Sequence, residues 1–588
     1  MPKFFFPTLR LLLVLALVAF VSTYSTLIIG LFQHSGEPEL LMTFFSIALI
    51  FSLSFGIFYL ARGTPLPSFV IAVFFGMAAQ PLLEPVTQNQ AVLGALVGFG
   101  ATLILFGGGL ETPFENFKKL FGKIMMLSFV GLGFTAIAFA FGVHALGAWT
   151  GFAISFTTAI LLGALLSSTD PAAIIPVLKR LRFNNPSTKD IIVSESAVTD
   201  VTGTLLTVAF LALAASGLLE SGILNGYQQI FTLDSAKLLF KQLVFGTAFG
   251  IVGYALLHVL TRFKGTHERE YEADSAFFLF IPIIIFTLAL AFGGSGYLAA
   301  FVAGLMFKLN ECLHETERFF NHTIDGFFKP TIFLMLGALI DLKGLFEYAP
   351  VGLLIALVFM FIIRPLAVFL SLAPFTVIGK DRTTWREIAF ISFVRETGAI
   401  PAVLLVTIAS LKIANIEGLL PIGLWVILST LTIEPLLTPW VAEKLKVATI
   451  IPDVDTDISA HADSVVVLGS RGNSWKRRLP LVADWASRHQ VPNVTLLMCY
   501  EYQHTPEKAA KAQLEFAELM KHINLKLVRN GYKPLRGELM VSEGLLQENI
   551  DRMSKVQNNI LAFFVGRKML DYKLDEIKRL SIPLFFMS

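Results

Sequence analysis

Uncharged apolar runs of about twenty residues recur along the first three quarters of this 588-residue chain. A backbone crosses a bilayer core of about 30 Å only if its polar groups bond to one another, and a helix of about twenty apolar residues meets that condition. Only 15% of the residues are charged, against about 25% in a soluble protein, so disorder and a single soluble domain are excluded. The sequence therefore predicts an all-α polytopic membrane protein, with helices at 7–32, 38–62, 66–84, 91–111, 123–146, 150–180, 190–217, 238–261, 274–293, 296–308, 326–342, 349–378, 385–410 and 417–442.

The distribution of basic residues predicts how these helices are oriented. With the N-terminus in the cytoplasm, twenty-one Lys and Arg of the helical region fall on the cytoplasmic side and four on the other. Such a bias is what the positive-inside rule requires, and a miscounted helix would scramble it. We expect residues 7–32 to be a retained helix and not a signal peptide, because the run is long and has no small-residue cleavage site. The protein is expected in a bacterial plasma membrane.

The character of the chain changes after Lys446. Residues 1–446 form the predicted transmembrane domain, 447–462 an acidic linker and 463–588 a cytoplasmic α/β domain with a mostly parallel sheet. Two cysteines, Cys312 and Cys499, are too few for a disulfide framework. In the last domain we expect strands at Ser464–Ser470, Val494–Tyr500, Leu525–Arg529, Gly537–Ser542, Asn559–Gly566 and Ile582–Met587, and helices at 475–489, 506–522, 544–556 and 571–580.

Seven charged residues stand out within the apolar runs of residues 1–446. A charge at the bilayer centre costs at least about 2.5–3.5 kcal/mol, so each one needs a partner, a watery cavity or a function. Glu434, followed by a proline, is expected to sit near a helix end and reach the surface, whereas two aspartates amid apolar stretches are expected to be functional. The seven are Asp170, Glu195, Asp200, Arg364, Arg395, Glu396 and Glu434.

The stretch ILLGALLSSTDPAA interrupts one predicted helix. Pro171 lacks an N–H and pushes Asp170 away from the helical region, so Thr169 and Asp170 should lie where the helix is broken. Unwound backbone in a membrane has to line a cavity or be buried in protein, and transporters build ion sites in this way. A simple proline kink, repaired by nearby hydroxyls, is the alternative.

The following stretch, DIIVSESAVTD, places ligands on one helical face. Ser196 and Asp200 are four residues apart and offer hard oxygen ligands for Na⁺ or K⁺. Glu195 is rotated from Ser196 by about 100° and is available to Arg364, in the apolar run IIRPLAV. A Glu195–Arg364 pair would hold two helices in register and leave Asp200 free for ions.

A second interruption is expected in FVRETGAIP, where Gly398 and Pro401 break a helix beside Arg395. Two interrupted helices, in corresponding positions of two halves, are typical of an inverted-repeat transporter.

The motifs STDPAA, SESAVTD, IIRPLAV and FVRETGAIP together resemble the monovalent cation–proton antiporters, of the NhaP-like sodium/proton exchanger branch, over roughly residues 40–445. The resemblance implies two crossed broken helices, inverted repeats and a homodimer. It also implies that Asp200 binds the cation and the proton, that Ser196 ligates the cation, and that Glu195 pairs with Arg364. Such proteins usually have thirteen helices, so 7–32 would be an additional one.

Three positions depart from that family pattern. Thr199 stands where electroneutral members have Asn and electrogenic members have Asp. Gly107 in LFGGGL replaces an acid, with Glu111 four residues later. Glu396 directly follows Arg395 and could neutralise it. We therefore expect one strongly titrating acid at the site.

The last domain resembles the universal stress protein fold. VVVLGSRGNS is a strand followed by glycines, for which an ordinary βα turn is the alternative. A phosphate cradle is not expected in FFVGRKMLDYKLDEI, which has one glycine, so the domain is expected to regulate or dimerise and to bind nucleotide at most as a minor possibility.

The sequence thus predicts a secondary antiporter that is not an enzyme and needs no cofactor or nucleic acid. Asp200 and Asp170 would alternately hold a proton and a cation, Na⁺ being favoured, with Thr169, Ser196 and Thr199 around them; exchange would be electroneutral. A K⁺/H⁺ antiporter, or a K⁺ efflux system regulated by the cytoplasmic domain, is the alternative. An intramembrane aspartyl protease with an Asp170–Asp200 dyad lacks a Gly-x-Gly-Asp stretch, and a passive cation channel remains open.

Overall fold

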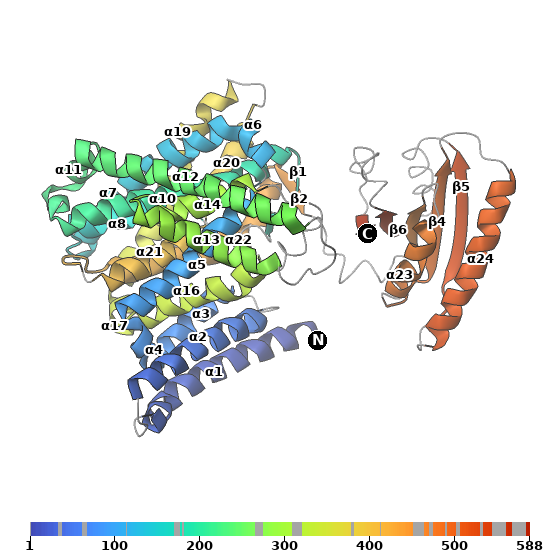
Figure 1. Ribbon diagram of the computed structural model, residues 1–588, viewed down its shortest axis with the longest axis horizontal. Coiled ribbons are helices and arrows are strands. Elements are labelled where there is room, and N and C mark those ends of the chain that lie inside the picture. The colour runs from blue at the N-terminus through green and yellow to red at the C-terminus, as the bar shows by residue number, and fades with distance from the viewer. Residues whose placement is uncertain are drawn as a thin grey trace. The chain divides into compact units, whose positions relative to one another are not determined.

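The protein divides into two compact units, Met1–Ile451 and Pro452–Ser588, which are described separately. Figure 1 draws the helices of the first unit from blue to orange and the sheet of the second in orange and red. The computed structural model describes residues 2–32, 38–61, 67–112, 114–169, 177–178, 181–264, 274–307, 320, 322–377, 382–394, 396–411, 413–450, 464–469, 474–488, 491–500, 506–529, 533–543, 560–566 and 584–587.

The first unit is almost entirely helical. Its first part contains α1 (Pro2–Phe32), α2 (Pro38–Ala61), α3 (Ser68–Ala78), α4 (Gln80–Thr87), α5 (Gln90–Glu111), α6 (Phe114–Met125), the π-helical turn η1 (Met126–Gly131), α7 (Leu132–Thr150), α8 (Phe156–Leu166), α10 (Pro186–Ala215), η2 (Leu218–Ser221), α11 (Ile223–Gln229) and α12 (Leu233–Lys264). Its second part contains α13 (Asp274–Ala291), α14 (Gly296–Met306), the π-helical turn η5 (Ile324–Phe328), α16 (Lys329–Ala338), α17 (Leu342–Glu347), α18 (Ala349–Val358), the π-helical turn η6 (Phe359–Ile363), α19 (Arg364–Leu372), η7 (Ala373–Thr376), α20 (Trp385–Phe393), α21 (Ala399–Ser410) and α22 (Leu419–Lys444).

Seven helices in the described part of the chain are long and apolar enough to cross a membrane, or eight if α3 and α4 count as one bent span. The expectation of a polytopic helical membrane protein is confirmed. Several predicted helices are composite. α3 and α4 meet at a 90° bend, and the described residues between α20 and α21, Val394 and Glu396–Gly398, are not helical. The predicted helix at 150–180 is α8 followed by the non-helical residues 167–169, and 170–176 lie outside the described residues.

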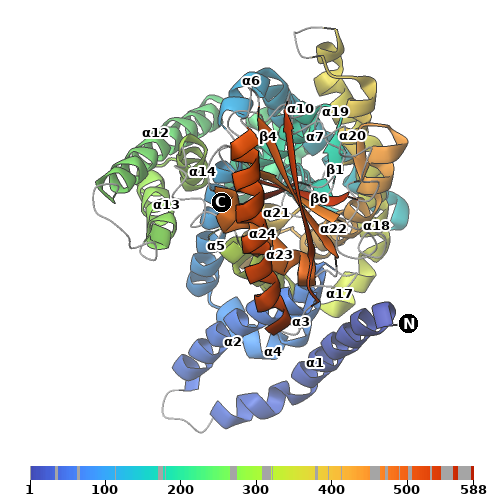
Figure 2. The ribbon, with the colours of Figure 1, turned by 90° about the vertical axis from the view of Figure 1, so that its right-hand side faces the viewer.

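Glycines let four helices of this unit cross in two tight pairs. In the α5–α14 crossing, a Cβ on Gly304 would overlap the carbonyl oxygen of Phe106, and one on Gly109 would overlap that of Phe301. The α3–α16 crossing is built in the same way, by Gly76 and Gly337. Close packing of small residues is a main source of helix association in membranes, where lipid is as apolar as the side chains. Figure 2 displays α14, α12 and α13 on one side of this unit and α18, α19 and α20 on the other.

A two-stranded antiparallel sheet closes one end of the helical unit. β1 (Leu181–Phe183), just before α10, pairs with β2 (Ala448–Ile450), just after α22. The prediction of a linker from residue 447 is wrong at its start, because Val447 is buried and Ala448–Ile450 bond to β1 as a strand. Residues 451–462 of the predicted linker lie outside the described residues.

The second unit contains a five-stranded parallel sheet with strand order β5-β4-β3-β6-β7. Its elements are β3 (Ser464–Gly469), α23 (Ser474–Arg488), β4 (Asn493–Tyr500), α24 (Pro506–Arg529), β5 (Arg536–Glu543), β6 (Ile560–Gly566) and β7 (Leu584–Met587). The steps from β3 to β4 and from β4 to β5 run in the same direction along the sheet. Right-handed crossovers therefore put α23 and α24 on one face, where both contribute to a single apolar core.

One predicted strand of this unit is wrong, since Leu525–Arg529 forms the last turns of α24. Phe516, Met520, Ile523 and Leu527 are buried at helical spacing, so the apolar face of α24 continues through the segment that we expected to be a strand. The predicted helices at 544–556 and 571–580 lie outside the described residues.

Candidate functional site

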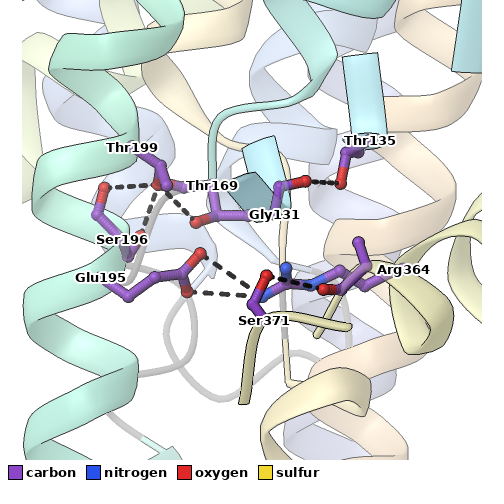
Figure 3. A network of polar contacts seen from close by, with 9 residues as sticks. Gly131, Thr135, Thr169, Glu195, Ser196, Thr199, Arg364 and Ser371 are labelled. Carbon is purple, nitrogen blue, oxygen red and sulfur yellow. Dashed lines mark hydrogen bonds and ion pairs between the residues drawn. The ribbon is translucent and has the colours of Figure 1, made fainter. Parts of the chain in front are cut away.

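Polar side chains gather where α8 ends and α10 passes it. Asn185 caps α10 by accepting a hydrogen bond from the Ser187 N–H at 3.1 Å, and Pro186 occupies the first helical position, so this helix has well-defined starting signals. Both threonines at this point are buried: Thr169 is 2% exposed and Thr199 is 0% exposed. The two hydroxyl oxygens lie 3.0 Å apart, which joins the unwound end of α8 to α10 (Figure 3).

Hydrogen bonding fixes the direction in which these hydroxyl groups point. Thr199 donates to the Ser196 carbonyl at 2.9 Å, and a hydroxyl has one hydrogen to give. Thr169 is therefore the donor in its contact with Thr199. Ser196 donates to the Thr169 carbonyl at 2.6 Å. The Thr169 and Ser196 hydroxyl groups thus both donate their single hydrogen to protein acceptors. Their oxygens have only lone pairs left for further contacts, and lone pairs can coordinate a cation.

Asp200 lies one residue beyond Thr199 and is 5% exposed. Its backbone carbonyl accepts a hydrogen bond from Thr204 at 2.6 Å. The end of α8 approaches α10 at Gly203, where a Cβ would lie only 2.7 Å from the Ser168 Cβ. A side chain at position 203 would push the Ser168–Thr169 segment away from α10. The glycine thus allows the hydroxyl contacts to form within one turn of Asp200.

Glu195 forms an ion pair with Arg364, which begins α19. Arg364 Nη2 lies 3.4 Å from both carboxylate oxygens, and each side chain is 2% exposed. Figure 3 shows Glu195 next to Ser196 and Thr199 on α10, with Arg364 reaching it from another helix. Removing one partner of such a buried pair leaves an uncompensated charge, at a cost of about 3–5 kcal/mol.

Two π-helical turns bring the helix of Arg364 to this position. η6 directly precedes Arg364, and η1 packs against α19 through Gly131, where a Cβ would meet the Ser371 Oγ at 2.8 Å. Ser371 donates to the Ala367 carbonyl at 2.8 Å and Thr135 to the Gly131 carbonyl at 2.7 Å (Figure 3). Single π-helical turns occur often at functional sites because they re-aim the side chains that follow.

The second helix interruption is also lined by hydroxyl groups. Gly398 caps α21, and Pro401 lies in its first turn, where proline is tolerated. Between α20 and α21, the Thr397 hydroxyl lies 2.6 Å from that of Thr430 on α22. Glu396 is completely buried.

Glu434 is buried as well, at 2% exposure, so the expectation that it reaches the surface is wrong. We expected this residue to lie near a helix end broken by Pro435. Instead α22 continues through Pro435 and Pro439 to Lys444 and keeps Glu434 inside the helical unit.

Several sites named from the sequence lie outside the described residues: Asp170, Pro171 and Arg395. Of the family-pattern departures, Gly107 is buried in α5 and Glu111 is that helix's last residue.

Sequence reasoning did not identify Gly203 or the two π-helical turns as parts of the site. Gly203 follows Asp200 by three residues on the same helix, so its spacing was an available signal. No sequence pattern marks the π-helical turns.

Residues 49–444 match the family model described as "Sodium/hydrogen exchanger, transmembrane". Among characterised proteins, the chain is 29% identical over 384 residues to the K(+)/H(+) antiporter NhaP of Alkalimonas amylolytica, covering 62% of this chain and 60% of that one. It is 30% identical over 313 residues to the K(+)/H(+) antiporter NhaP2 of Shewanella oneidensis, covering 52% and 50%. The chain thus spans about half to three fifths of the length of these two relatives.

A third relative is the Na(+)/H(+) antiporter 1 of Methanocaldococcus jannaschii, 25% identical over 385 residues, covering 63% of this chain and 84% of that one. The fold is similar to the solved structure of the sodium proton antiporter MjNhaP1 from the same organism, with a TM-score of 0.55 at 22% identity. That match covers 69% of this chain and 99% of the other.

The burial of Glu195 and Arg364 predicts how variants of the pair affect stability. Glu195→Gln and Arg364→Ala should each lower the free energy of unfolding by about 3–5 kcal/mol, because each leaves one charge buried without its partner. The double variant should be more stable than the sum of the two losses implies. Thermal unfolding of the purified protein, in a double-mutant cycle, measures the coupling.

Asp325→Asn is the matched control. It removes an ion pair of 2.7 Å to Lys329 in which the acid is 51% exposed, so it should cost less than about 1 kcal/mol. Single variants of Glu195 and Arg364 that melt like wild type would contradict the assignment.

Proposed function

This chain belongs to the sodium/hydrogen exchanger family, and on that premise we propose that it is a secondary antiporter that exchanges protons for monovalent cations across the plasma membrane by alternating access. The observation that carries the proposal is the buried set of oxygen ligands around Thr169, Ser196 and Asp200 at the end of a broken helix. Such a set suits a dehydrated alkali cation, and its carboxylate suits a proton.

The proposed mechanism is competition for one carboxylate. Asp200 holds either a proton or a cation, because a proton on the carboxylate removes the charge that attracts the cation. The Thr169 and Ser196 hydroxyl oxygens, with their hydrogens already donated, would complete the cation's shell. Thr199 holds the unwound segment against α10 through its two hydrogen bonds. Asp170, adjacent to Thr169 in the sequence, is the proposed second acid.

In this mechanism the Glu195–Arg364 pair is structural. Arg364 is a permanent cation, and its Nη2 lies 3.4 Å from the Glu195 carboxylate, whose charge it neutralises. Asp200 is thus the acid that we propose to bind and release the exchanged proton.

Several internal correspondences support the proposal of an inverted repeat. Taken in chain order, α2, α3, α5, α7, α8 and α10 correspond to α13, α14, α16, α19, α20–α21 and α22. The tight glycine crossings then become reciprocal, since α3 packs on α16 as α14 packs on α5. η1 lies in one half where η6 lies in the other. The Thr169–Thr199 contact at the first break corresponds to Thr397–Thr430 at the second.

The relatives named above differ in the cation that their names give. Two relatives at 29–30% identity are K(+)/H(+) antiporters, and one at 25% identity is a Na(+)/H(+) antiporter. We retain Na⁺ as the favoured cation and K⁺ as the alternative, the latter either in plain K⁺/H⁺ exchange or in an efflux system regulated by the second unit. Membership of an exchanger family argues against the protease and the channel.

The remaining proposals concern assembly and the second unit. We propose a homodimer in the bacterial plasma membrane, with the α/β unit in the cytoplasm as a regulatory domain. Its parallel order β5-β4-β3-β6-β7 supports a relation to nucleotide-binding α/β folds such as the universal stress proteins. A nucleotide is the lesser proposal for this unit, because FFVGRKMLDYKLDEI contains one glycine and does not resemble a phosphate-binding loop.

The proposal predicts that Asp200→Asn abolishes proton-coupled cation flux while the protein still folds, because the substitution removes the titrating ligand and keeps its size. Less than a tenth of wild-type exchange should remain, a change of at least about 1.4 kcal/mol in rate terms. The assay is dequenching of a pH-sensitive dye in proteoliposomes on addition of Na⁺, K⁺ or Li⁺.

Thr207→Val is the control for this experiment. Thr207 is buried on the same helix, and its hydroxyl only bonds back to the Gly203 carbonyl at 2.7 Å. It should retain exchange. Substantial exchange by a folded Asp200→Asn protein would contradict the role of Asp200 as the ligand that binds both proton and cation.

The identity of Thr199 predicts electroneutral exchange. Thr199 cannot ionise and Glu195 is paired with Arg364, so Asp200 alone exchanges one proton for one cation, and no net charge moves. The membrane field acts only on moved net charge, with about 2.3 kcal/mol per charge per 100 mV. Proteoliposomes adsorbed on a sensor membrane should therefore show no steady transport current in a cation gradient, although dye dequenching reports exchange.

Thr199→Asp is the matched variant, because it adds a second carboxylate beside the first. If it folds and transports, it should produce a current. A steady current from the wild-type protein would mean that Asp170 or Glu195 also carries protons.

A further inference from the structure

A pocket of about 580 Å³ lies at the end of the helical unit where α10 begins, α20 begins and α22 ends. Its walls include Asn184 and Asn185 before α10, Arg382, Trp385 and Arg386 at the start of α20, and Lys446 after α22. None of these residues belongs to the proposed exchange site.

The pocket carries an excess of positive charge. Arg382, Arg386 and Lys446 are exposed, and none of them forms an ion pair within the described part of the chain. Glu387 is the single acid in the lining, and it is 6% exposed. Its carboxylate accepts hydrogen bonds from the Asn185 amide at 2.8 Å, the Thr188 hydroxyl at 3.1 Å, and the Thr384 N–H and hydroxyl at 2.6 and 2.9 Å. The Glu387 carboxylate is thus fully used by hydrogen bonds within the pocket wall, and the three exposed cations give the lining its positive charge.

Lys446 holds an uncommon backbone conformation at the edge of this pocket, with a φ of 57°. Glycine is the usual residue at this position after a helix. Here a lysine is kept in place instead, because its carbonyl accepts a hydrogen bond from the Asn184 amide at 2.8 Å and the next carbonyl, of Val447, accepts from the Asn184 N–H at 3.0 Å. The Lys446 ammonium group is thereby added to the Arg382 and Arg386 guanidinium groups at the pocket.

We propose that this pocket binds the phosphate headgroup of an anionic phospholipid. Trp385 is 54% exposed at the rim and stacks on Phe369 of α19, with ring centroids 5.3 Å apart and planes inclined by 21°. Phe369, Leu366 and Leu370 form an exposed apolar stripe on α19, beside which acyl chains can lie. Tryptophan and basic side chains are enriched where helices leave the bilayer, and basic pockets there bind lipid headgroups. A soluble phosphate would use the cations but not the apolar rim.

The pocket is also linked to both helix interruptions. The Glu387 hydrogen bonds join the start of α20 to the start of α10, and α10 carries Glu195 and Asp200 further along. α20 ends at Phe393, shortly before Thr397, whose hydroxyl group contacts that of Thr430 on α22. A lipid in the pocket would hold the ends of all three helices together and thereby promote exchange; this part of the inference rests on the proposed function.

The binding test compares three proteins in detergent: wild type, Arg382→Gln/Arg386→Gln/Lys446→Gln, and the control Lys118→Gln/Lys119→Gln, which removes two exposed lysines of α6 outside the pocket. Each is titrated with phosphatidylglycerol or cardiolipin, with phosphatidylcholine, or with inorganic phosphate, while the melting temperature is followed. The anionic lipids should raise the melting temperature of wild type and control. In the triple variant they should bind about a hundredfold more weakly, at roughly fivefold per cation removed.

An equal lipid response in the triple variant would overturn the site. If inorganic phosphate raises the melting temperature as much as the lipids do, the occupant is a soluble phosphate and not a lipid. Should the triple variant fail to fold in phosphatidylcholine, Arg386→Gln alone, with lipid retention measured by native mass spectrometry, serves instead and must retain less lipid than wild type.

The transport arm is separate. Wild-type exchange in proteoliposomes should be higher with phosphatidylglycerol than with phosphatidylcholine alone, and the triple variant should lose that difference. If no protein exchanges cations but the lipid shift is still lost in the triple variant, the proposed function fails and the binding site stands. If exchange occurs with no lipid dependence in wild type, the promotion of exchange is refuted.

Discussion

Glu195 on α10 and Arg364 on α19 hold opposite charges 3.4 Å apart, with each side chain 2% exposed. Desolvation makes either charge alone very costly, and their attraction in a low-dielectric interior compensates for it only while both are in place. The pair therefore fixes the position of α10 against α19. Because Thr199 and Asp200 lie about one turn further along α10, the same contact determines where the carboxylate of the site is held.

Thr169, Ser196 and Thr199 can contact one another because α10 is held in this position. Thr199 and Ser196 bond to Thr169 from α10, and Gly203 leaves room for the segment that carries Thr169. Unwound backbone buried in a membrane protein needs partners for its polar groups, and Ser196 of α10 supplies one to the Thr169 carbonyl. The Thr397–Thr430 contact provides the same kind of support at the second interruption. The end of α8 and the segment before α21 are thus each held by a hydroxyl group of a neighbouring continuous helix.

Much of this arrangement follows from the sequence, because charges in apolar runs are rare and informative. A charged side chain buried in a membrane needs a partner, and this cost alone predicted that Arg364 would pair with Glu195. The structure confirms the pair. The same reasoning failed for Glu434, where a proline was given more weight than the continuing apolar pattern of α22. It also failed at Leu525–Arg529, where a short β-prone run concealed the periodicity of a long helix. Contacts such as Gly203 with Ser168 depend on how two helices cross, which no local pattern encodes.

The central claim is that protons and cations compete for Asp200. The most direct test is to measure protons released when Na⁺ or K⁺ binds to the purified protein in weakly buffered detergent solution, since a carboxylate must lose its proton to ligate the ion. The account predicts release of about one proton per bound cation from wild type and none from Asp200→Asn. Cation binding without proton release, or undiminished release from a folded Asp200→Asn protein, would contradict it.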